Sequence, residues 1–144
     1  MPQEIIDYLA TQRVGVLAVE MPDGSPHGAT LHFATNTEAN EFYFRTSPAY
    51  KKMESLAERT TTRASFVVGT TEAEMKTFQL DGVLRKITAE EQAAFEAAYL
   101  GKLTEKKGKS SDGVGLVFTP TWWRFTDWTK PEGKFVLSSE TTSN

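Results

Sequence analysis

The chain has 144 residues, a formal net charge of −3 and no cysteine. This length favours one domain with a sizeable core, and the charge gives no general attraction to nucleic acid or to an anionic membrane. The lack of cysteine excludes disulfides, thiolate metal sites and thiol nucleophiles. Apolar runs are far shorter than a membrane span, and acidic Glu4 and Asp7 stand where a signal peptide has basic residues. We therefore expect a soluble, cytoplasmic protein.

The first half of the chain alternates short apolar segments with turn signals. The apolar positions of residues 2–12 recur at helical spacing, and the sequence Pro-Asp-Gly-Ser at residues 22–25 is typical of a turn between antiparallel strands. The elements expected here are a helix over residues 2–12, strands over residues 14–20, 27–34 and 41–45, and a helix from residue 48 to about residue 59. A polar loop is expected over residues 60–63.

The second half has the same alternation with two longer strands. Gly82 interrupts an apolar pattern and predicts a bulge or bend, while Pro120 predicts an edge or a kink. Thr88 and Glu91 have the spacing of a capping box, and Phe95, Ala98 and Tyr99 form the inward face of the helix that follows. The elements expected are strands over residues 64–69, 76–88 and 114–127, a helix to about residue 100, a mobile loop over residues 103–112 and a short strand over residues 134–137.

About six antiparallel strands with closely spaced turns and two or three helices favour a small closed or split β-barrel. The parallel α/β alternative needs long alternation of strands and helices, which this chain lacks. The glycine-rich phosphate motifs of nucleotide-binding folds are absent as well.

The segment 42–56, FYFRTSPAYKKMESL, joins a strand to a helix. Ser47 is expected as the N-cap and Pro48 as the first helical residue. Arg45, Lys51 and Lys52 would then gather at a positive helix N-terminus, where a phosphate binds readily. The alternative is that the two lysines form a solvated helix face.

Other polar and aromatic residues allow more than one interpretation. His27 and His32 lie five residues apart on one strand, so they face opposite sides and make a zinc site very improbable. Trp123 and Phe125 share one face of the last long strand and Trp122 and Trp128 the other; one face belongs to the core, and the other lines a pocket or a dimer interface. The serines have no acid or base implied nearby that would make one a nucleophile.

In their order along the chain, these segments resemble the FMN-binding split barrels related to pyridoxamine 5′-phosphate oxidase, including the small general-stress-type proteins. The resemblance runs from Ile5 to about Trp128 and rests on the segments HGATLHF, FYFRTSPAYKKMESL, FQLDGVLRKIT and FTPTWWRFTDW. It implies a mainly β fold, an antiparallel split barrel of six to seven strands with two or three flanking helices. One FMN-binding domain would cover residues 1–130, followed by a tail over residues 131–144 with one short strand and a disordered end.

The resemblance also implies which residues hold the cofactor. Members of this family bind the flavin phosphate after the third strand and the ring and ribityl chain along the second strand. Aromatic residues of the last strand close the site from the partner subunit of a homodimer. The positions that match are Ala29, Thr30, Leu31, His32, Arg45, Thr46, Lys51, Lys52, Thr77 and Trp123.

The chain departs from the oxidase itself in two places. It has His32 and the sequence Tyr50-Lys51-Lys52 where the oxidase has basic motifs, and it lacks the C-terminal arginine and histidine motif that holds pyridoxal phosphate. Oxidation of pyridoxamine phosphate is therefore not expected. A flavin-dependent oxidoreductase acting on an unknown small molecule, with a nicotinamide donor, is the first hypothesis. The alternative is a non-catalytic module that holds flavin, deazaflavin or haem, or no cofactor at all.

Overall fold

The computed structural model describes residues 1–109 and 112–141. Within these ranges one antiparallel sheet of eight strands is flanked by three α-helices, which confirms the mainly β fold with slightly more strands than expected. The strands are β1 (Val14–Glu20), β2 (Pro26–His32), β3 (Ala34–Thr35), β4 (Phe42–Thr46), β5 (Thr61–Val68), β6 (Lys76–Lys86), β7 (Val114–Asp127) and β8 (Phe135–Ser138). The helices are α1 (Gln3–Thr11), α2 (Glu54–Glu58) and α3 (Gln92–Lys102), with short 3₁₀ helices η1 (Lys51–Met53), η2 (Glu72–Glu74) and η3 (Thr104–Lys106).

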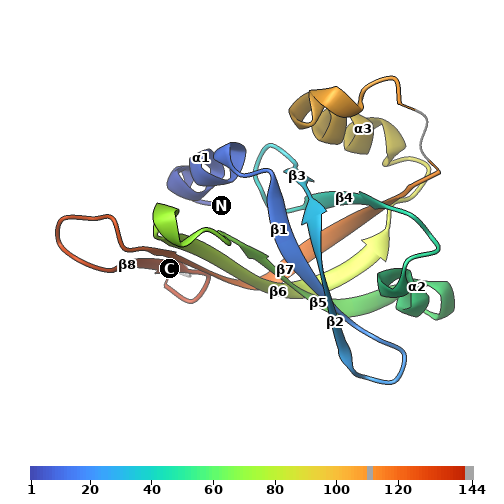
Figure 1. The fold of residues 1–144 in the computed structure, drawn as a ribbon, viewed down its shortest axis with the longest axis horizontal. Helices are drawn as coiled ribbons and strands as arrows, with labels where there is room; N and C mark the ends of the chain where they lie inside the picture. The colour runs from blue at the N-terminus through green and yellow to red at the C-terminus, as the bar shows by residue number, and fades with distance from the viewer. Residues whose placement is uncertain (110–111, 142–144) are drawn as a thin grey trace.

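The order of the strands curls the sheet into a half-barrel. Neighbouring strands run β2-β1-β5-β6-β7-β4-β3, and β8 pairs with the far end of β7. Only Phe33 separates β2 from β3 in the chain, yet these two strands lie at opposite ends of the order. The sheet must therefore curl until its ends approach each other, and β2 contacts β4 across the opening. Figure 1 shows the three helices spaced around this curled sheet.

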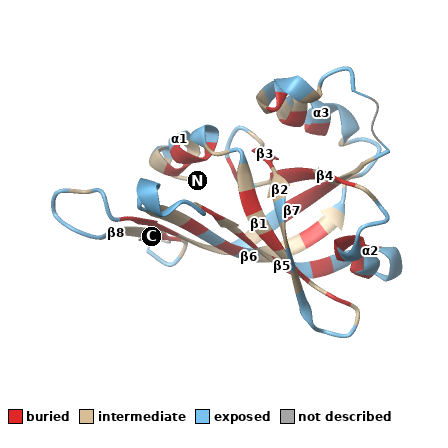
Figure 2. Cartoon of the chain, in the orientation of Figure 1, coloured by how far each residue is buried: buried red, intermediate tan, exposed pale blue. Residues whose placement is uncertain are grey.

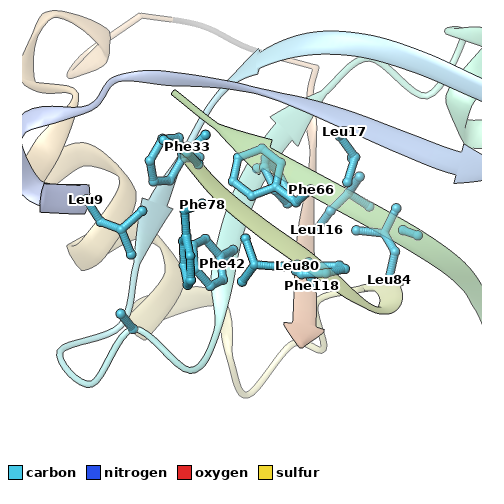
Figure 3. Close-up of a cluster of buried hydrophobic side chains, with 14 of the residues drawn as sticks. Leu9, Leu17, Phe33, Phe42, Phe66, Phe78, Leu80, Leu84, Leu116 and Phe118 are labelled. Atoms are coloured by element: carbon cyan, nitrogen blue, oxygen red, sulfur yellow. The ribbon is translucent and has the colours of Figure 1, made fainter. Parts of the chain in front are cut away.

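Phenylalanine rings fill the inside of the half-barrel. The ring centroid of Phe66 lies 5.3 Å from that of Phe33, 5.6 Å from that of Phe42 and 5.0 Å from that of Phe44. All four side chains are fully buried, and Figure 3 shows three of them beside leucines of β1, β6 and β7. Burying each ring stabilises the fold by about 1.5–3 kcal/mol, so this cluster is a major source of stability.

A second, smaller core lies between α3 and the other face of β4. It consists of Ala34, Tyr43, Phe95, Tyr99, Leu103 and Val117. Tyr43 stands between Phe42 and Phe44 in β4 and so points to the opposite face of the strand. Gly115 of β7 leaves room for this core and for Ile87 packed against it, because a Cβ on it would lie 2.5 Å from Cδ1 of Ile87 and 3.2 Å from Cζ of Phe95. The buried residues of α3 accordingly lie on the side that faces β3 and β4 (Figure 2).

The start of α3 follows the expected capping box in part. The Glu91 carboxylate accepts hydrogen bonds from the backbone N–H of Thr88 at 3.2 Å and from its hydroxyl at 2.8 Å. Arg85 donates to both carboxylate oxygens, at 2.8 and 3.0 Å, and this pairing is the largest cause that lowers the pKa of Glu91 to about 2. The helix begins at Gln92, however, because residues 88–91 form turns instead of helix.

The expected helix start at Ser47 and Pro48 is wrong. The backbone N–H of Tyr50 donates to the carbonyl oxygen of Ser47 at 3.2 Å, so these residues form a turn, and η1 begins only at Lys51. The Ser47 hydroxyl accepts a hydrogen bond from the N–H of Ala49 at 3.3 Å. A serine bonded to its own following backbone competes with helix formation, which explains the later start.

Two further boundaries differ from the sequence prediction. The expected loop at residues 60–63 is mostly strand, and Thr62 is buried with its hydroxyl donating to the carbonyl oxygen of Glu20 at 2.9 Å. The single strand expected over residues 27–34 is broken at Phe33, whose N–H donates to the carbonyl oxygen of Arg13 at 3.1 Å. Both differences arise from partners far away in the chain.

The C-terminal half agrees closely with the sequence prediction. The bounds of β7 are those expected, and β8 confirms the short strand of the tail, shifted by one residue. The loop expected over residues 103–112 contains η3, while Ser110 and Ser111 of that loop and the end of the tail at residues 142–144 lie outside the described residues. None of the described helices is both long and apolar enough to cross a membrane.

The longest strand pair, β6 with β7, is bent at Gly82 as expected. The register shifts between Asp81 and Gly82, and Gly82 faces Pro120. A Cβ on Gly82 would lie 2.2 Å from the carbonyl oxygen of Thr119 and 2.8 Å from Cα of Pro120. Pro120 in turn lies between the parts of β7 that pair with β4 and with β8, so its missing N–H leaves no gap in either ladder.

We expect Gly82→Ala to lower the free energy of unfolding by about 2–3 kcal/mol, because the added methyl group overlaps the backbone of β7. Urea unfolding followed by circular dichroism measures this. Gly28→Ala is the matched control, since a Cβ there would meet only Cγ1 of Val16 at 3.8 Å. Its effect should stay within about 0.5 kcal/mol. Equal midpoints for the two variants would show that the close approach is unimportant.

Candidate functional site

A cavity of about 280 Å³ lies where the end of β4 meets β2 and α3. Its walls are Leu31, Arg45, Thr46, Ser47, Tyr50, Tyr99, Lys106, Asp112 and Gly113. Leu31, Arg45 and Thr46 are among the cofactor residues expected from the sequence. They come together because β2 and β4 face each other across the opening of the half-barrel.

Thr46 places an unsatisfied hydroxyl beside this cavity. The residue is 5% exposed, and in residues 1–109 and 112–141 its Oγ1 is the one buried side-chain nitrogen or oxygen without a hydrogen-bond partner. A buried polar group left unpaired costs about 1–3 kcal/mol. A native structure rarely retains such a group without a reason, and a ligand oxygen would satisfy it.

Lys52 is a buried cation close to the same place. It is 6% exposed, and its Nζ lies 4.5 Å from the ring centroid of Tyr50, which lines the cavity and is itself 58% exposed. No carboxylate of the described residues forms an ion pair with it, and burial lowers the pKa of Lys52. A buried ammonium group is costly without an anion beside it, so this environment favours a negatively charged ligand.

Arg45 approaches the cavity from the opposite face of β4. Its guanidinium carbon lies 5.2 Å from the ring centroid of Tyr99 and 5.6 Å from that of Phe95, both on α3. Its one ion pair among the described residues is with Glu96, at 4.0 Å. The two stacked rings therefore fix the guanidinium group more firmly than the carboxylate does.

Positive charge prevails around the α3 side of the cavity. The Lys106 Nζ lies 5.9 Å from the ring centroid of Tyr99. Burial, and then the charges of Lys106 and Arg13, lower the pKa of His32. Arg13 is itself paired with Glu105. His32, next to Leu31 on β2, is consequently neutral at pH 7, and it offers a hydrogen-bonding nitrogen instead of a charge.

The remaining expected residues lie farther from the cavity. On β2, Ala29 is half-buried and Thr30 is exposed on the outer face of the sheet. Lys51 is exposed and lines a separate hollow beside the turn that carries Asp23. Neighbouring lysines thus differ completely in burial, and the structure brings Lys52 but not Lys51 close to Tyr50.

Thr77 and Trp123 lie on the other side of the bend in β6 and β7. Thr77 pairs with Thr126, and the ring of Trp123 packs on that of Phe78 with 6.0 Å between centroids. Neither residue lines the cavity of this chain. Their contact with a cofactor stays a prediction, which requires a second subunit.

Besides Ser47, five residues of the cavity are not singled out as binding residues by the sequence: Tyr50, Tyr99, Lys106, Asp112 and Gly113. The sequence pattern places Tyr50 in the helix expected from residue 48, Tyr99 on the inward face of another helix, and Lys106 and Asp112 in the loop over residues 103–112. The spacing of Phe95 and Tyr99, four residues apart on α3, does predict a shared aromatic face. Nothing in the sequence indicates that Arg45, fifty residues earlier, lies against that face.

The positive helix N-terminus expected after Ser47 is not available to a phosphate. The helix α2 has five residues and begins at Glu54, beyond both lysines. Binding of an anion in this region would therefore depend on the side chains of Thr46 and Lys52, and the short helix adds little. Among the described residues no group of three or more His, Asp or Glu side chains is arranged to hold a metal ion.

The half-barrel agrees with the comparison with known protein families. Residues 1–127 match the family described as pyridoxamine 5′-phosphate oxidase. The chain belongs to the pyridoxamine 5′-phosphate oxidase family, as the sequence resemblance indicated. No curated protein sequence matches the chain.

Solved structures share the fold at low identity. A conserved hypothetical protein from Mycobacterium tuberculosis, Rv2991, is 21% identical with a TM-score of 0.67, over 88% of this chain and 84% of that one. A heme binding protein from Mycobacterium smegmatis is 20% identical with a TM-score of 0.70, over 92% of this chain and 55% of that one. A Clostridium acetobutylicum protein related to general stress protein 26 is 11% identical with a TM-score of 0.68, over 96% and 94%. These likenesses establish the fold alone.

We expect Thr46→Val to raise the free energy of unfolding of the ligand-free protein by about 1 kcal/mol, because it removes an unpaired buried hydroxyl and keeps the side-chain shape. Thr62→Val is the matched control. Thr62 is equally buried but donates a hydrogen bond at 2.9 Å, so its loss should destabilise by about 1 kcal/mol. Urea unfolding of both variants measures whether their free energies of unfolding change in opposite directions. Destabilisation by both would mean that the Thr46 hydroxyl already has a partner.

Proposed function

We propose that the chain binds FMN, with the phosphate between the hydroxyl of Thr46 and the ammonium group of Lys52. The observation that carries this proposal is the unpaired, buried Thr46 hydroxyl beside the cavity at the end of β4. A phosphate accepts hydrogen bonds from a hydroxyl and from an ammonium group, and a charged acceptor makes both bonds stronger. The membership of the pyridoxamine 5′-phosphate oxidase family supports the choice of a flavin.

The other residues of the cavity would orient the rest of the cofactor. Leu31 offers an apolar contact at the cavity wall, while Ala29, Thr30 and His32 offer backbone and polar contacts along β2. When bound, the flavin supplies hydride transfer, and the protein supplies orientation and exclusion of water. The proposed activity is a flavin-dependent oxidoreductase that takes hydride from a reduced nicotinamide or passes it to a small acceptor.

A homodimer is part of this proposal. The outer face of β1 and β5 carries half-exposed Val16, Ala18, Ser65 and Val67 in adjacent cross-strand pairs. Beside them is a hollow of about 380 Å³ that extends to Asp81. A second copy seated on this surface would cover the apolar side chains. A cytoplasmic location also belongs to the proposal and rests on the cysteine-free sequence.

The absorption spectrum of the purified protein tests the cofactor first. Oxidised flavin gives bands in the blue, whereas deazaflavin and haem each give a different spectrum. Haem is a relevant alternative because the neighbour from Mycobacterium smegmatis is a heme binding protein. A haem spectrum, or no chromophore even after incubation with FMN, would contradict the proposal. Oxidation of NADH or NADPH by the yellow protein then separates an enzyme from a carrier.

We expect Lys52→Met to weaken FMN binding by about tenfold to a hundredfold, because one charge-assisted hydrogen bond is worth about 1.5–3 kcal/mol. Methionine keeps the buried volume and removes the charge. Titration of FMN into the apoprotein, followed by quenching of flavin fluorescence, measures the affinity.

Lys51→Met is the control for this titration. Lys51 is exposed and faces the turn with Asp23, so its loss should change the affinity less than about threefold. Equal weakening by both variants would indicate a general effect of positive charge and would contradict a specific contact of Lys52 with the phosphate.

We expect Ala18→Arg to convert the dimer to a monomer, because a charged side chain would be placed in the centre of the apolar outer face. Sedimentation equilibrium at micromolar concentration should give twice the chain mass of 16.0 kDa for the wild type and the chain mass for the variant. Ala97→Arg, on the exposed face of α3, should remain dimeric. A monomeric wild type would contradict the homodimer and the binding of a flavin between subunits.

A further inference from the structure

A second cavity, of about 240 Å³, lies beside the first and beneath α3. It shares Arg45, Lys106 and Gly113 with the first cavity, and Gln92, Phe95 and Glu96 of α3 form much of its wall. The two cavities thus adjoin along the Arg45 side chain. The one contribution of β4 to this cavity is Arg45.

The contacts of Arg45 with two aromatic rings leave its N–H donors without hydrogen bonds among the described residues. The guanidinium group is held by ring centroids at 5.2 and 5.6 Å, those of Tyr99 and Phe95. The side chain is only 17% exposed, yet among the described residues none of its five N–H donors makes a hydrogen bond. Rings engage the flat face of a guanidinium group, whereas carboxylates and phosphates bind its edge, commonly through two parallel bonds.

The acidic neighbours do not satisfy this charge. Glu96 is 49% exposed and its Oε1 lies 4.0 Å from Nη2 of Arg45, beyond hydrogen-bond distance. Lys106 adds a second cation to the same wall and has no ion pair among the described residues. A mostly buried guanidinium group without an acceptor is costly, so the cavity is suited to an anion.

The geometry of β4 separates this place from the phosphate position at Thr46. Thr46 follows Phe42 and Phe44 on the barrel side of the strand, whereas Arg45 follows Tyr43 on the α3 side. A phosphate held by Thr46 and Lys52 would therefore lie on the other face of β4 from the Arg45 side chain, although Arg45 also lines the first cavity.

We propose that the cavity beneath α3 is a second anion site, in which Arg45 and Lys106 bind a carboxylate or phosphate group of a small molecule. The site does not depend on FMN binding. If FMN does bind, an anionic substrate can lie next to the cofactor, with its charged group anchored by Arg45. Arg45 is then a specificity-determining residue for acidic substrates, separate from the residues that hold the cofactor.

Inorganic phosphate and malonate are suitable probes for this site. In a ¹⁵N-labelled protein, the backbone amide of Gly115, on the cavity wall, and the Nε–Hε pair of Arg45 report binding directly. We expect both signals to shift and saturate with at least one probe. Tighter binding of phosphate would identify phosphorylated ligands, and tighter binding of malonate would identify carboxylic acids. No saturable shift at Gly115 with either probe would overturn the proposal.

Substitutions distinguish binding at this cavity from a general attraction of the probes to positive charge. We expect Arg45→Met, which keeps the stacking volume, and Lys106→Met to weaken the response at Gly115 by about tenfold or more. Lys107→Met is the matched control on an exposed neighbour of Lys106 and should bind as the wild type does. If Arg45→Met does not fold, the comparison of Lys106→Met with Lys107→Met still tests the proposal. Equal affinity of these two variants for the probe would contradict the site.

Repeating the titration with saturating FMN distinguishes one site from two. Retained binding of the probe at Gly115 supports a second site, and displacement of the probe by FMN would show that Arg45 belongs to the cofactor site. If FMN does not bind at all, the proposed cofactor is wrong, while the response of the ligand-free protein still tests the anion site on its own.

Discussion

The close contact between β6 and β7 at Gly82 and Pro120 is the constraint on which the other features depend. The backbone of β7 occupies the space that a side chain at Gly82 would need, and the two longest strands bend together at this register shift. The bend allows the ends of the strand order to approach, so that β2 faces β4. The cavity at Thr46 exists only because of this closure, since its walls come from β2, β4 and α3. A flat sheet with the same strands would separate these residues.

Strand β4 then determines the chemistry of the site, since it is buried on both faces. Alternation sends Phe42 and Phe44 into the half-barrel and Tyr43 toward α3, and it continues to the end of the strand. Thr46 therefore ends on the barrel side and Arg45 on the α3 side. Two polar groups adjacent in sequence lie in different environments, one a hydroxyl without a hydrogen-bond partner among the described residues and the other a cation beside two stacked rings.

Local patterns in the sequence predicted features whose causes are local. The bounds of β1 and β7, the bulge at Gly82 and the hydrogen bond from Thr88 to Glu91 before α3 follow from alternation and from the chemistry of single residues. Most of the errors have distant causes; the late helix start after Ser47, whose hydroxyl bonds to the N–H of Ala49, is the local exception. Thr62 is strand because its hydroxyl bonds to β1, and no nearby residue indicates this. The family resemblance placed both Lys51 and Lys52 at the phosphate, but only tertiary packing decides which of them is buried.

The unsatisfied groups at the end of β4 link ligand binding to the stability of this region. The Thr46 hydroxyl and the buried Lys52 ammonium group both raise the free energy of the ligand-free protein, because among the described residues the hydroxyl has no hydrogen-bond partner and the ammonium group has only the ring of Tyr50 beside it. An anion that pairs with them removes this cost and binds the native state alone, so it also stabilises the fold. Strand β4 supports both hydrophobic cores. A ligand bound at its end, as proposed, would therefore act on the half-barrel through Phe44 and on α3 through Tyr43.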